Sequence, residues 1–349
     1  MDSLLAQTNN NFELLFVDYG SNEDVTKQTE KLLASYPFVK YVYSDTRGQF
    51  WNRAHAINTG IKLSSGEIIL ISDIDLVFRQ DFISSLNRLS FNKRFYTFKC
   101  YYLEPNINYS NITEIELKNT KINYVGLCAA SKENLLNISG FDEYYMLWGG
   151  EDDDLYKRLE STGCEWHQME VDEFPVFHQW HASHAPSHPT PWYLETINYL
   201  YLGNKKQKDT DFGKLVKTID RTILNKVSEN GKFKCFELYG NPWLQFNIFI
   251  IGFANMMPGE FGQFEFPIKP KMQLPRGRKQ KVIDGMNIIL KKWDFPYSME
   301  KKVVVVPDMH TRERWNEFVN YFVGKNRAFL ADYYLLNTEK KLVLYFQKK

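Results

Sequence analysis

The first part of the chain alternates short apolar runs with segments of helical spacing. Apolar runs of strand length lie at residues 13–18, 39–44 and 67–72, and helical spacing fills residues 22–35 and 50–63 between them. Strands joined by helices through short links predict right-handed βαβ units in a parallel sheet. We therefore expect an α/β fold with a Rossmann-like, mostly parallel sheet flanked by helices.

The pattern continues toward residue 204 and changes beyond it. Further strands are predicted at residues 94–102, 123–131 and 165–171, and further helices at residues 81–89 and 155–162. Residues 205–213 are polar and charged, which is typical of a linker. The remainder mixes predicted strands (232–238, 302–306, 341–346) with predicted helices (212–227, 311–323). We predict one domain over residues 1–204 and an additional α+β region over residues 205–349, for which no motif indicates a role.

Composition narrows the class of protein. The 349 residues carry a net charge of +1, which gives no general argument for nucleic-acid binding. The 4 cysteines form no C-x-x-C pair, so free thiols in a reducing compartment are the simplest interpretation. No apolar run is long enough to predict a membrane-spanning helix, and no signal peptide is recognisable. We expect a cytoplasmic protein, and leave open a peripheral contact with a membrane surface.

Two groups of carboxylates stand out from this background. Asp73 and Asp75 follow an apolar run at residues 68–71, and open α/β sheets bind ligands at the carboxyl ends of their strands. Residues 146–154 read MLWGGEDDD, so four consecutive acids stand where a helix is predicted to begin. A helix start gains from one or two acids, so the others need a cation, a metal or a hydroxyl-rich substrate. The alternatives are turn-forming aspartates after a strand and an over-acidic helix cap.

Several segments together resemble the nucleotide-sugar-dependent glycosyltransferases of the GT-A fold. The early part is similar to glycosyltransferase family 2 through SLLAQT at residues 3–8, FVDYGS at 16–21, NRAHAINTGI at 52–61 and Asp73-Ile-Asp75. Residues 140–159 (GFDEYYMLWGGEDDDLYKRL) resemble the acceptor and catalytic segment of β-1,4-galactosyltransferases and chondroitin-synthase-type enzymes. The resemblance implies a GT-A fold for residues 1–204.

The sequence departs from the family pattern at two places. The resemblance begins inside the family's first helix, so we expect the family's first strand to be missing, with residues 302–306 as a candidate to fill that sheet edge. Tyr19 stands in place of the second Asp of V-D-D-G-S, whereas Asp18 keeps the first.

The resemblance implies a divalent metal that stabilises the departing nucleoside diphosphate. Asp75 is the expected direct ligand, and Asp73 would join the metal group by holding the ribose or a metal-bound water. His178 stands where these families often place a metal-binding His, and His181 is the second candidate. A carboxylate pair with one His suits Mn²⁺ somewhat better than Mg²⁺. The alternative for each His is a loop residue with ordinary hydrogen bonds.

The resemblance also assigns the acidic string to catalysis and to the acceptor. Asp152 would be the base that takes a proton from the attacking hydroxyl, so that a single displacement inverts the anomeric centre. Glu151 and Asp153 would hold acceptor hydroxyls. Trp148 would offer an aromatic face to a sugar ring, with plain core packing as the alternative. Gly149 on the donor side and Gly150 on the acceptor side would let the backbone approach the substrates closely.

Three residues are candidates for the donor nucleotide. Asp18 could accept from a uracil N–H or a ribose hydroxyl. Arg53 could pair with the diphosphate, because a guanidinium matches phosphate geometry, or could be a solvated charge on a helix face. Asn58 is a weaker candidate. The basic, Pro-rich residues 269–281 are either a solvated loop or a site for a lipid diphosphate or a membrane surface.

We therefore predict a metal-dependent, inverting glycosyltransferase. It would move a hexose or N-acetylhexosamine, of the galactose or GalNAc type, from a UDP-sugar to a glycan or glycolipid acceptor in surface polysaccharide or glycoconjugate synthesis. A catalytically impaired, glycosyltransferase-like carbohydrate-binding or scaffold protein is the alternative. A nucleotidyltransferase is disfavoured because no Gly-rich loop with a basic residue lies near the first strand. The oligomeric state is left open.

Overall fold

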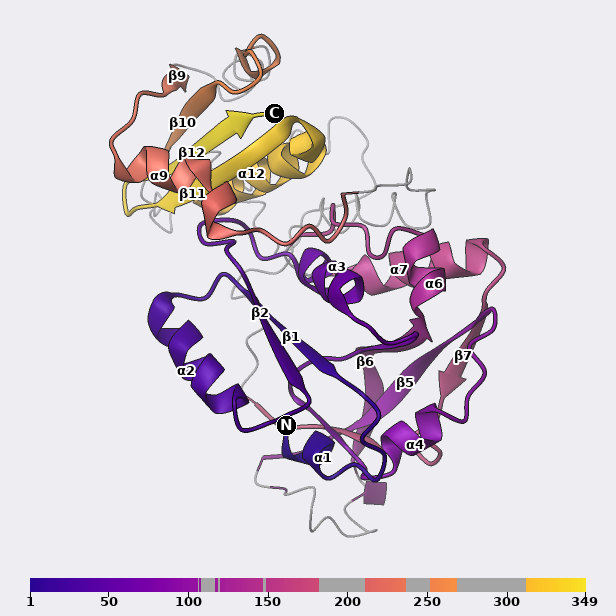
Figure 1. The fold of residues 1–349 in the computed structure, drawn as a ribbon. Coiled ribbons are helices and arrows are strands. Elements are labelled where there is room, and N and C mark those ends of the chain that lie inside the picture. Colours follow the sequence, from indigo (N-terminus) through magenta and orange to yellow (C-terminus); the bar gives the residue numbers. More distant parts are fainter. Residues whose placement is uncertain are drawn as a thin grey trace, which may run out of the picture. The chain divides into compact units, whose positions relative to one another are not determined.

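The structure is a computed structural model that divides into two compact units, Met1–Thr222 and Ile223–Lys349 (Figure 1). It describes residues 1–105, 107, 117–118, 120–146, 149–181, 211–236, 252–268 and 312–349. The expected domain boundary after residue 204 lies outside these ranges. So do Trp148, the basic residues 269–281 and the strand predicted at 302–306, and these remain predictions.

The first unit opens with a parallel βαβ element. Strand β1 (Leu14–Tyr19) pairs in parallel with β2 (Val39–Ser44), with Leu14 opposite Val39. Helix α2 (Glu23–Leu33) connects them and begins after Asn22, whose side chain accepts a hydrogen bond from the Val25 amide at 3.0 Å. This N-cap and the two strands confirm the predicted βαβ unit.

A six-stranded sheet forms the rest of the first unit. Its order is β3-β6-β5-β8-β4, and β7 also pairs with β5. The strands are β3 (Ile68–Ile71), β4 (Leu76–Phe78), β5 (Arg94–Tyr102), β6 (Lys121–Ser131), β7 (Glu165–Met169) and β8 (Val176–His178).

The sheets are mixed, so the α/β class is confirmed, whereas the expectation of a mostly parallel sheet is corrected. Strand β5 is parallel to β7 and β8, but the pairs β3–β6, β5–β6 and β4–β8 are antiparallel. The prediction failed because an apolar run such as Ile68–Ile71 carries no information on strand direction. Only Ile71 of that run is buried, so its composition overstated the burial.

Two helices bring their first turns to this sheet. Helix α3 (Arg53–Leu63) begins after Asn52, whose side chain accepts from the His55 amide at 2.8 Å. Helix α7 (Glu151–Ser161) begins four residues before the predicted residue 155, so all four acids lie in its first turn. Acids are favoured there because the first amides of a helix point outward without partners. The shorter helices are α1 (Asp2–Leu5), α4 (Phe82–Leu86) and α6 (Lys132–Asn137).

A shared apolar core fixes α3 and α7 relative to the strands. Ala54 and Ile61 of α3 pack in one cluster with Leu155 and Leu159 of α7 and with Phe95 of β5, and all five side chains are buried. Because the two helices share this core, their polar N-termini are held over the same part of the sheet. A second cluster includes Phe82, Phe98 and Phe174.

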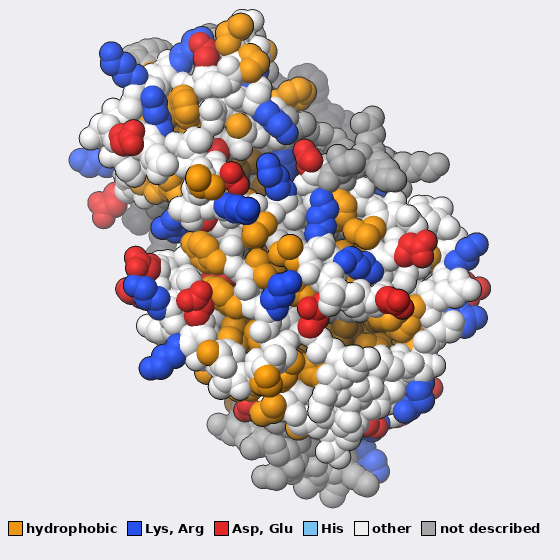
Figure 2. Space-filling view, in the orientation of Figure 1, with side chains coloured by type: hydrophobic (Ala, Val, Ile, Leu, Met, Phe, Trp, Pro, Cys, Tyr) orange, Lys and Arg blue, Asp and Glu red, His pale blue; other side chains and the backbone are white. Residues whose placement is uncertain are grey.

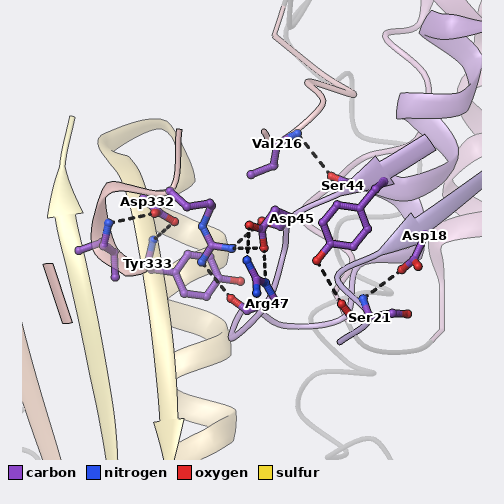
Figure 3. Close-up of polar contacts among 11 residues, drawn as sticks. Asp18, Ser21, Ser44, Asp45, Arg47, Val216, Asp332 and Tyr333 are labelled. Atoms are coloured by element: carbon purple, nitrogen blue, oxygen red, sulfur yellow. Dashed lines mark hydrogen bonds and ion pairs between the residues drawn. The ribbon is translucent and has the colours of Figure 1, made fainter. Parts of the chain in front are cut away.

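Residues 211–221, which we call the anchor segment, contact the end of β2 and the first two turns of α3. The amide of Asp45 donates to the carbonyl of Val216 at 2.9 Å. The amide of Val216 in turn donates to Oγ of Ser44 at 3.4 Å (Figure 3). Arg221 is 1% exposed and donates to the carbonyl oxygens of Asp45 at 2.5 Å and Arg47 at 2.9 Å. The helix predicted over 212–227 is therefore wrong in its first part, because the backbone here bonds to another strand. Only α9 (Thr222–Ser228) and a 3₁₀ turn at Thr218–Asp220 are helical.

The second unit contains a four-stranded sheet with the order β11-β12-β10-β9. The strands are β9 (Lys234–Phe236), β10 (Phe261–Pro267), β11 (Leu330–Asn337) and β12 (Lys341–Lys348), and helix α12 (Arg312–Asn326) accompanies them. Buried rings of Phe264, Phe266, Trp315, Phe322 and Phe346 form its core. The predicted strand at 341–346 and helix at 311–323 are confirmed, whereas β10 and β11 were missed because their sequences alternate less regularly.

The described residues show no membrane-spanning helix and a surface of mixed charge (Figure 2). No helix among the described residues is long and apolar enough to cross a membrane. On the face shown in Figure 2, positive and negative side chains are interspersed among apolar ones, as expected for a net charge of +1.

Candidate active site

Asp75, His178 and His181 come together at one end of the six-stranded sheet. Strand β4 pairs with β8 so that Leu76 lies opposite His178, which brings the preceding Asp75 beside the histidines. The Asp75 Oδ2 atom lies 3.3 Å from Nε2 of His178 and 3.2 Å from Nε2 of His181. The three potential ligand atoms all lie within 4.8 Å of one another. One carboxylate and two imidazoles at this spacing can bind a divalent transition metal.

The surroundings of this cluster favour a bound cation. The Oδ1 atom of Asp75 is buried and has no hydrogen-bond partner among the described residues. An unpaired buried carboxylate oxygen is costly, and a cation would satisfy it. The ring of Tyr102 stacks on His178 at a centroid distance of 4.5 Å and an interplanar angle of 16°, which fixes the orientation of that imidazole. Burial raises the pKa of the nearby Cys100 thiol to about 12, so this cysteine stays protonated.

Arg53 joins the two acidic groups that the sequence placed far apart. Its Nη1 atom lies 3.0 Å from Asp152 Oδ1, and its Nη2 atom lies 3.0 Å from Asp73 Oδ1. The Nε atom contacts the same oxygen of Asp73 at 3.3 Å, and Glu151 lies 3.6 Å from Nη1. The guanidinium also donates to the carbonyl of Gly126 at 3.2 Å. One side chain from α3 therefore holds carboxylates from the β3–β4 connection and from α7 in one site.

The four acids of α7 point to different environments. Glu151 is largely buried and accepts from the Gly149 amide at 3.0 Å, whereas Asp152 is half-buried against Arg53 and Asp153 is exposed. Asp154 faces the interior and forms a 2.7 Å ion pair with Arg158. Helical periodicity explains the division, because consecutive residues lie about 100° apart around the axis.

Two glycines make the turn that delivers these acids. Gly149 has a φ of 102° and Gly150 a φ of 86°, which are left-handed conformations that side chains other than glycine disfavour. This conformational need explains both glycines without any contact to a substrate. Their predicted donor and acceptor roles stay predictions.

Burial controls the ionisation of the two acids next to Arg53. It raises the pKa of Asp152 above the ordinary aspartate range, and the charge of Arg53 only partly offsets this. Burial likewise raises the pKa of Glu151, with the neighbouring charge of Asp152 as the second cause. A carboxylate with a raised pKa is a stronger base, so the site favours proton acceptance.

The predicted donor residue Asp18 is buried at the carboxyl end of β1. Its oxygens accept from the hydroxyl of Tyr41 at 2.7 Å and from the amide of Ser21 at 3.0 Å. The neighbouring Tyr19 hydroxyl lies 2.8 Å from His55 Nδ1, and its ring meets Trp51 edge-on at 5.4 Å. Tyr19 therefore packs against α3 rather than replacing the acidic function of an aspartate.

Asn58 lies in the protein interior. Its side chain is 0% exposed, accepts from the Phe141 amide at 2.8 Å and donates to Glu143 Oε1 at 2.9 Å. The same Glu143 oxygen accepts from the amide of Gly213 at 2.6 Å, so this polar cluster ties α3 to the anchor segment. We therefore leave Asn58 out of the proposed donor site.

Several residues with clear roles were missed from the sequence. Asp45 is fully buried and lies 2.8 Å from Arg47. Its structural role could not be predicted from the neighbouring sequence, because its partners Val216 and Arg221 are distant in the chain. The Asp154–Arg158 pair could have been found, since residues four apart share a helix face. Gly126 could also have been found, because an isolated glycine in a strand indicates a close approach by another group.

Comparison with known proteins identifies the part of the chain that carries this site. Residues 1–107 match the sequence model of glycosyl transferase family 2, and residues 109–181 match that of the N-terminal domain of galactosyltransferase. Residues 1–181 belong to the GT-A glycosyltransferases. The recognition from short motifs is thereby confirmed: a family 2-like first part is followed by a galactosyltransferase-type segment.

Curated relatives are similar over the same region. Beta-1,4-galactosyltransferase 1 of Bos taurus is 29% identical over 128 residues, which cover 35% of this chain and 28% of that protein. Chondroitin sulfate N-acetylgalactosaminyltransferase 2 of Mus musculus is 27% identical over 198 residues, which cover 51% of this chain and 35% of that protein. The chain thus spans about a third of the length of these relatives.

Among solved structures, GalNAc-T7 with UDP, GalNAc and Mn²⁺ aligns with 75% of this chain and 56% of that chain, at 13% identity and a TM-score of 0.41. At this score, the fold assignment rests on the sequence matches and on the α/β architecture of the first unit.

Proposed function

We propose that this glycosyltransferase chain is a metal-dependent, inverting enzyme that transfers a hexose or N-acetylhexosamine from a UDP-sugar to a glycan acceptor. The observation that carries the proposal is the position of Arg53, which lies 3.0 Å from both Asp73 and Asp152. A donor-side carboxylate and a candidate base thus share one site. The named relatives favour a sugar of the galactose or GalNAc type. Synthesis of surface polysaccharide or glycoconjugate in the cytoplasm, close to a membrane, is the setting we propose.

Asp75, His178 and His181 would hold the metal. The buried, unpaired Oδ1 of Asp75 and the two imidazoles fit a divalent ion, and this donor set suits Mn²⁺ better than Mg²⁺. Such an ion supplies positive charge that stabilises the departing diphosphate. Tyr102 would keep His178 oriented for this role by stacking on its ring.

Asp152 would act on the acceptor. As the acceptor oxygen bonds to the anomeric carbon, the bond from that carbon to the diphosphate breaks, and Asp152 takes the hydroxyl proton. Attack on the face opposite the leaving group inverts the configuration. Asp153, exposed one residue further along α7, can reach an acceptor hydroxyl, whereas Glu151 is held by the Gly149 amide and supports the turn.

Thermal protection by nucleotide sugars tests this proposal. UDP-Gal, UDP-GalNAc, UDP-Glc and UDP-GlcNAc would each be added with and without Mn²⁺ to the wild type and to Asp75→Asn. A ligand at 100 times its Kd adds about 2.7 kcal/mol of stability. We expect protection by at least one sugar in the wild type, only with Mn²⁺, and none in Asp75→Asn. Absence of protection by every UDP-sugar would contradict the proposal. Glycan binding without transfer would instead favour a carbohydrate-binding protein.

A further inference from the structure

Gly126 lies in the middle of β6, directly beneath the guanidinium of Arg53. Its carbonyl accepts from Nη2 of Arg53 at 3.2 Å. A Cβ atom placed on Gly126 would overlap Nη2 and would lie 3.1 Å from both Cζ of Arg53 and Oδ2 of Asp152. Any side chain here must therefore displace the guanidinium or the carboxylate. Gly126 lies where the register of β5 and β6 shifts, and its φ is not in the left-handed region, so glycine is required here by the neighbouring site rather than by a positive φ.

The guanidinium itself is occupied by protein groups. Its Nε atom faces Asp73, Nη1 faces Asp152 and Glu151, and Nη2 faces Asp73 and the Gly126 carbonyl. A guanidinium has five N–H donors. The contacts above lie in the directions in which these N–H groups point. Little capacity remains for a phosphate. The arrangement therefore points away from the diphosphate-binding role that the sequence suggested for Arg53.

We propose that Gly126 and Arg53 form a positioning pair for the transfer reaction. Because Gly126 has no side chain, the guanidinium of Arg53 fits against β6, and from there it holds Asp152 in position. This inference rests on the proposed function of the site. Without the guanidinium, the carboxylates of Asp73 and Asp152 repel each other across a partly buried space. Displacement of a catalytic group by about 1 Å can cost on the order of 100-fold in rate.

The pair acts on chemistry rather than on donor binding, and this distinguishes it from a ligand role. If Arg53 only sets the position of Asp152, its loss lowers kcat and leaves the affinity for the UDP-sugar nearly unchanged. If Arg53 binds the diphosphate, its loss lowers the donor affinity as well. The two outcomes separate in a measurement of kcat against donor protection.

Substitution of Gly126 by alanine gives the first test, because it removes no charge and no hydrogen-bonding side chain. We expect Gly126→Ala to lower kcat by about 100-fold while Mn²⁺-dependent protection by the UDP-sugar changes by less than about threefold in Kd. Gly60→Ala in α3 is the matched control. Its Cβ would meet only Val17 Cγ2 at 3.8 Å, so kcat should stay within about twofold of the wild type.

A double-mutant cycle with Arg53→Lys gives the second test. Lysine keeps the charge but cannot bridge two carboxylates in a fixed geometry, so we expect a loss of about tenfold in kcat. If Gly126 acts through the guanidinium, adding Gly126→Ala to Arg53→Lys costs at least about tenfold less than it costs in the wild type.

Specific outcomes would overturn the inference. Wild-type kcat in Gly126→Ala, additive effects in the cycle, or a loss of donor protection in Arg53→Lys would each do so. Unfolding of the same four proteins in urea, which needs no substrate, measures the coupling independently. Coupling in unfolding with no effect on kcat would reduce the pair to a structural contact. A wild-type protein that binds no UDP-sugar would refute the proposed function instead.

Discussion

Two arginines bind carboxylates from the first turn of the same helix, yet their surroundings differ. Arg158 and Asp154 form an ion pair whose side chains are 4% and 2% exposed, and Arg158 also donates to the carbonyls of Ile138 and Gly140. Arg53 and Asp152 are 18% and 31% exposed, and Arg53 is shared among three acids. The first pair is closed off by the protein, whereas the second is open on one side.

The comparison shows how one run of four acids serves both fold and site. Asp154 points inward, where its charge is fully matched by one arginine within the same helix. Asp152 points to the sheet, where one arginine must balance three acids and where burial raises the pKa of the carboxyl group. The imbalance of charge, and not the run of acids itself, marks the part of α7 that is suited to chemistry.

The largest expected effect is on stability and lies at the closed pair. Asp154→Asn leaves Arg158 buried without its counter-charge, and loss of one partner of a buried pair costs about 3–5 kcal/mol. Urea denaturation should show this loss. Asp153→Asn, on the exposed side of the same turn, should change the free energy of unfolding by less than about 0.5 kcal/mol. If Asp154→Asn lowers the free energy of unfolding by less than about 1 kcal/mol, the buried pair does not contribute to stability as we propose.

A second closed pair extends the comparison to the anchor segment. Asp45→Asn removes the charge that faces Arg221 and Arg47 but leaves the bonds from Arg221 to two backbone carbonyls, so we expect a loss of about 1–3 kcal/mol. Urea unfolding at pH 7 measures it.

The pH dependence of stability provides a separate check on Asp45. Burial alone would raise the pKa of Asp45, but hydrogen bonds from Arg47 and Thr218 and the charges of Arg47 and Arg221 outweigh it and hold the pKa below its usual value. The stabilisation is therefore complete above the unfolded pKa of about 3.9 and is lost as the pH falls through the lowered folded value. The wild type should lose this contribution in acid, whereas Asp45→Asn should lack it at every pH.

Catalysis at the open pair should also be lost in acid, but at a higher pH, because the pKa of Asp152 is shifted in the opposite direction to that of Asp45. Asp152 must be ionised to accept a proton, and burial raises its pKa, so kcat/KM should decline as the pH falls through a value above the ordinary aspartate range. A profile of kcat/KM against pH measures this acid limb. Asp153→Asn should keep the same limb. A rate that stays constant down to the ordinary aspartate range would argue against Asp152 as the base.

The smallest effect is expected at a surface pair. Arg79 and Asp81 lie 2.5 Å apart but are 45% and 41% exposed, so Arg79→Gln should change the free energy of unfolding by no more than about 0.5 kcal/mol. Thermal unfolding at low and high salt would measure it. A loss comparable to that of Asp154→Asn would mean that exposure does not explain the difference between the pairs.

The hydrophobic pattern of the sequence predicted the elements whose structure depends mainly on their own residues. The strands at residues 39–44 and 94–102 have the predicted bounds, because apolar and aromatic residues predominate in both. The resemblance named Asp73, Asp75, His178 and His181 for the metal. The structure brings the last three together, whereas Asp73 faces Arg53.

The sequence pattern did not predict the features that depend on contacts between distant segments of the chain. The anchor segment bonds to residues about 170 positions away, such as Asp45 to Val216, and no local spacing reports that. The antiparallel pairing of β3 depends on β6, which follows it by some fifty residues. The sequence likewise could not predict that Arg53 binds three acids, because these acids come from two other parts of the fold.

The release of UDP on addition of acceptor, compared between Asp152→Asn and Asp154→Asn, tests the central claim most directly. With Mn²⁺ and the donor found by thermal protection, Asp152→Asn should lose about 10²–10⁴-fold in kcat while keeping its stability and donor binding. Asp154→Asn, assayed at a temperature where it remains folded, should keep most of its kcat. Unchanged turnover in Asp152→Asn would contradict the account.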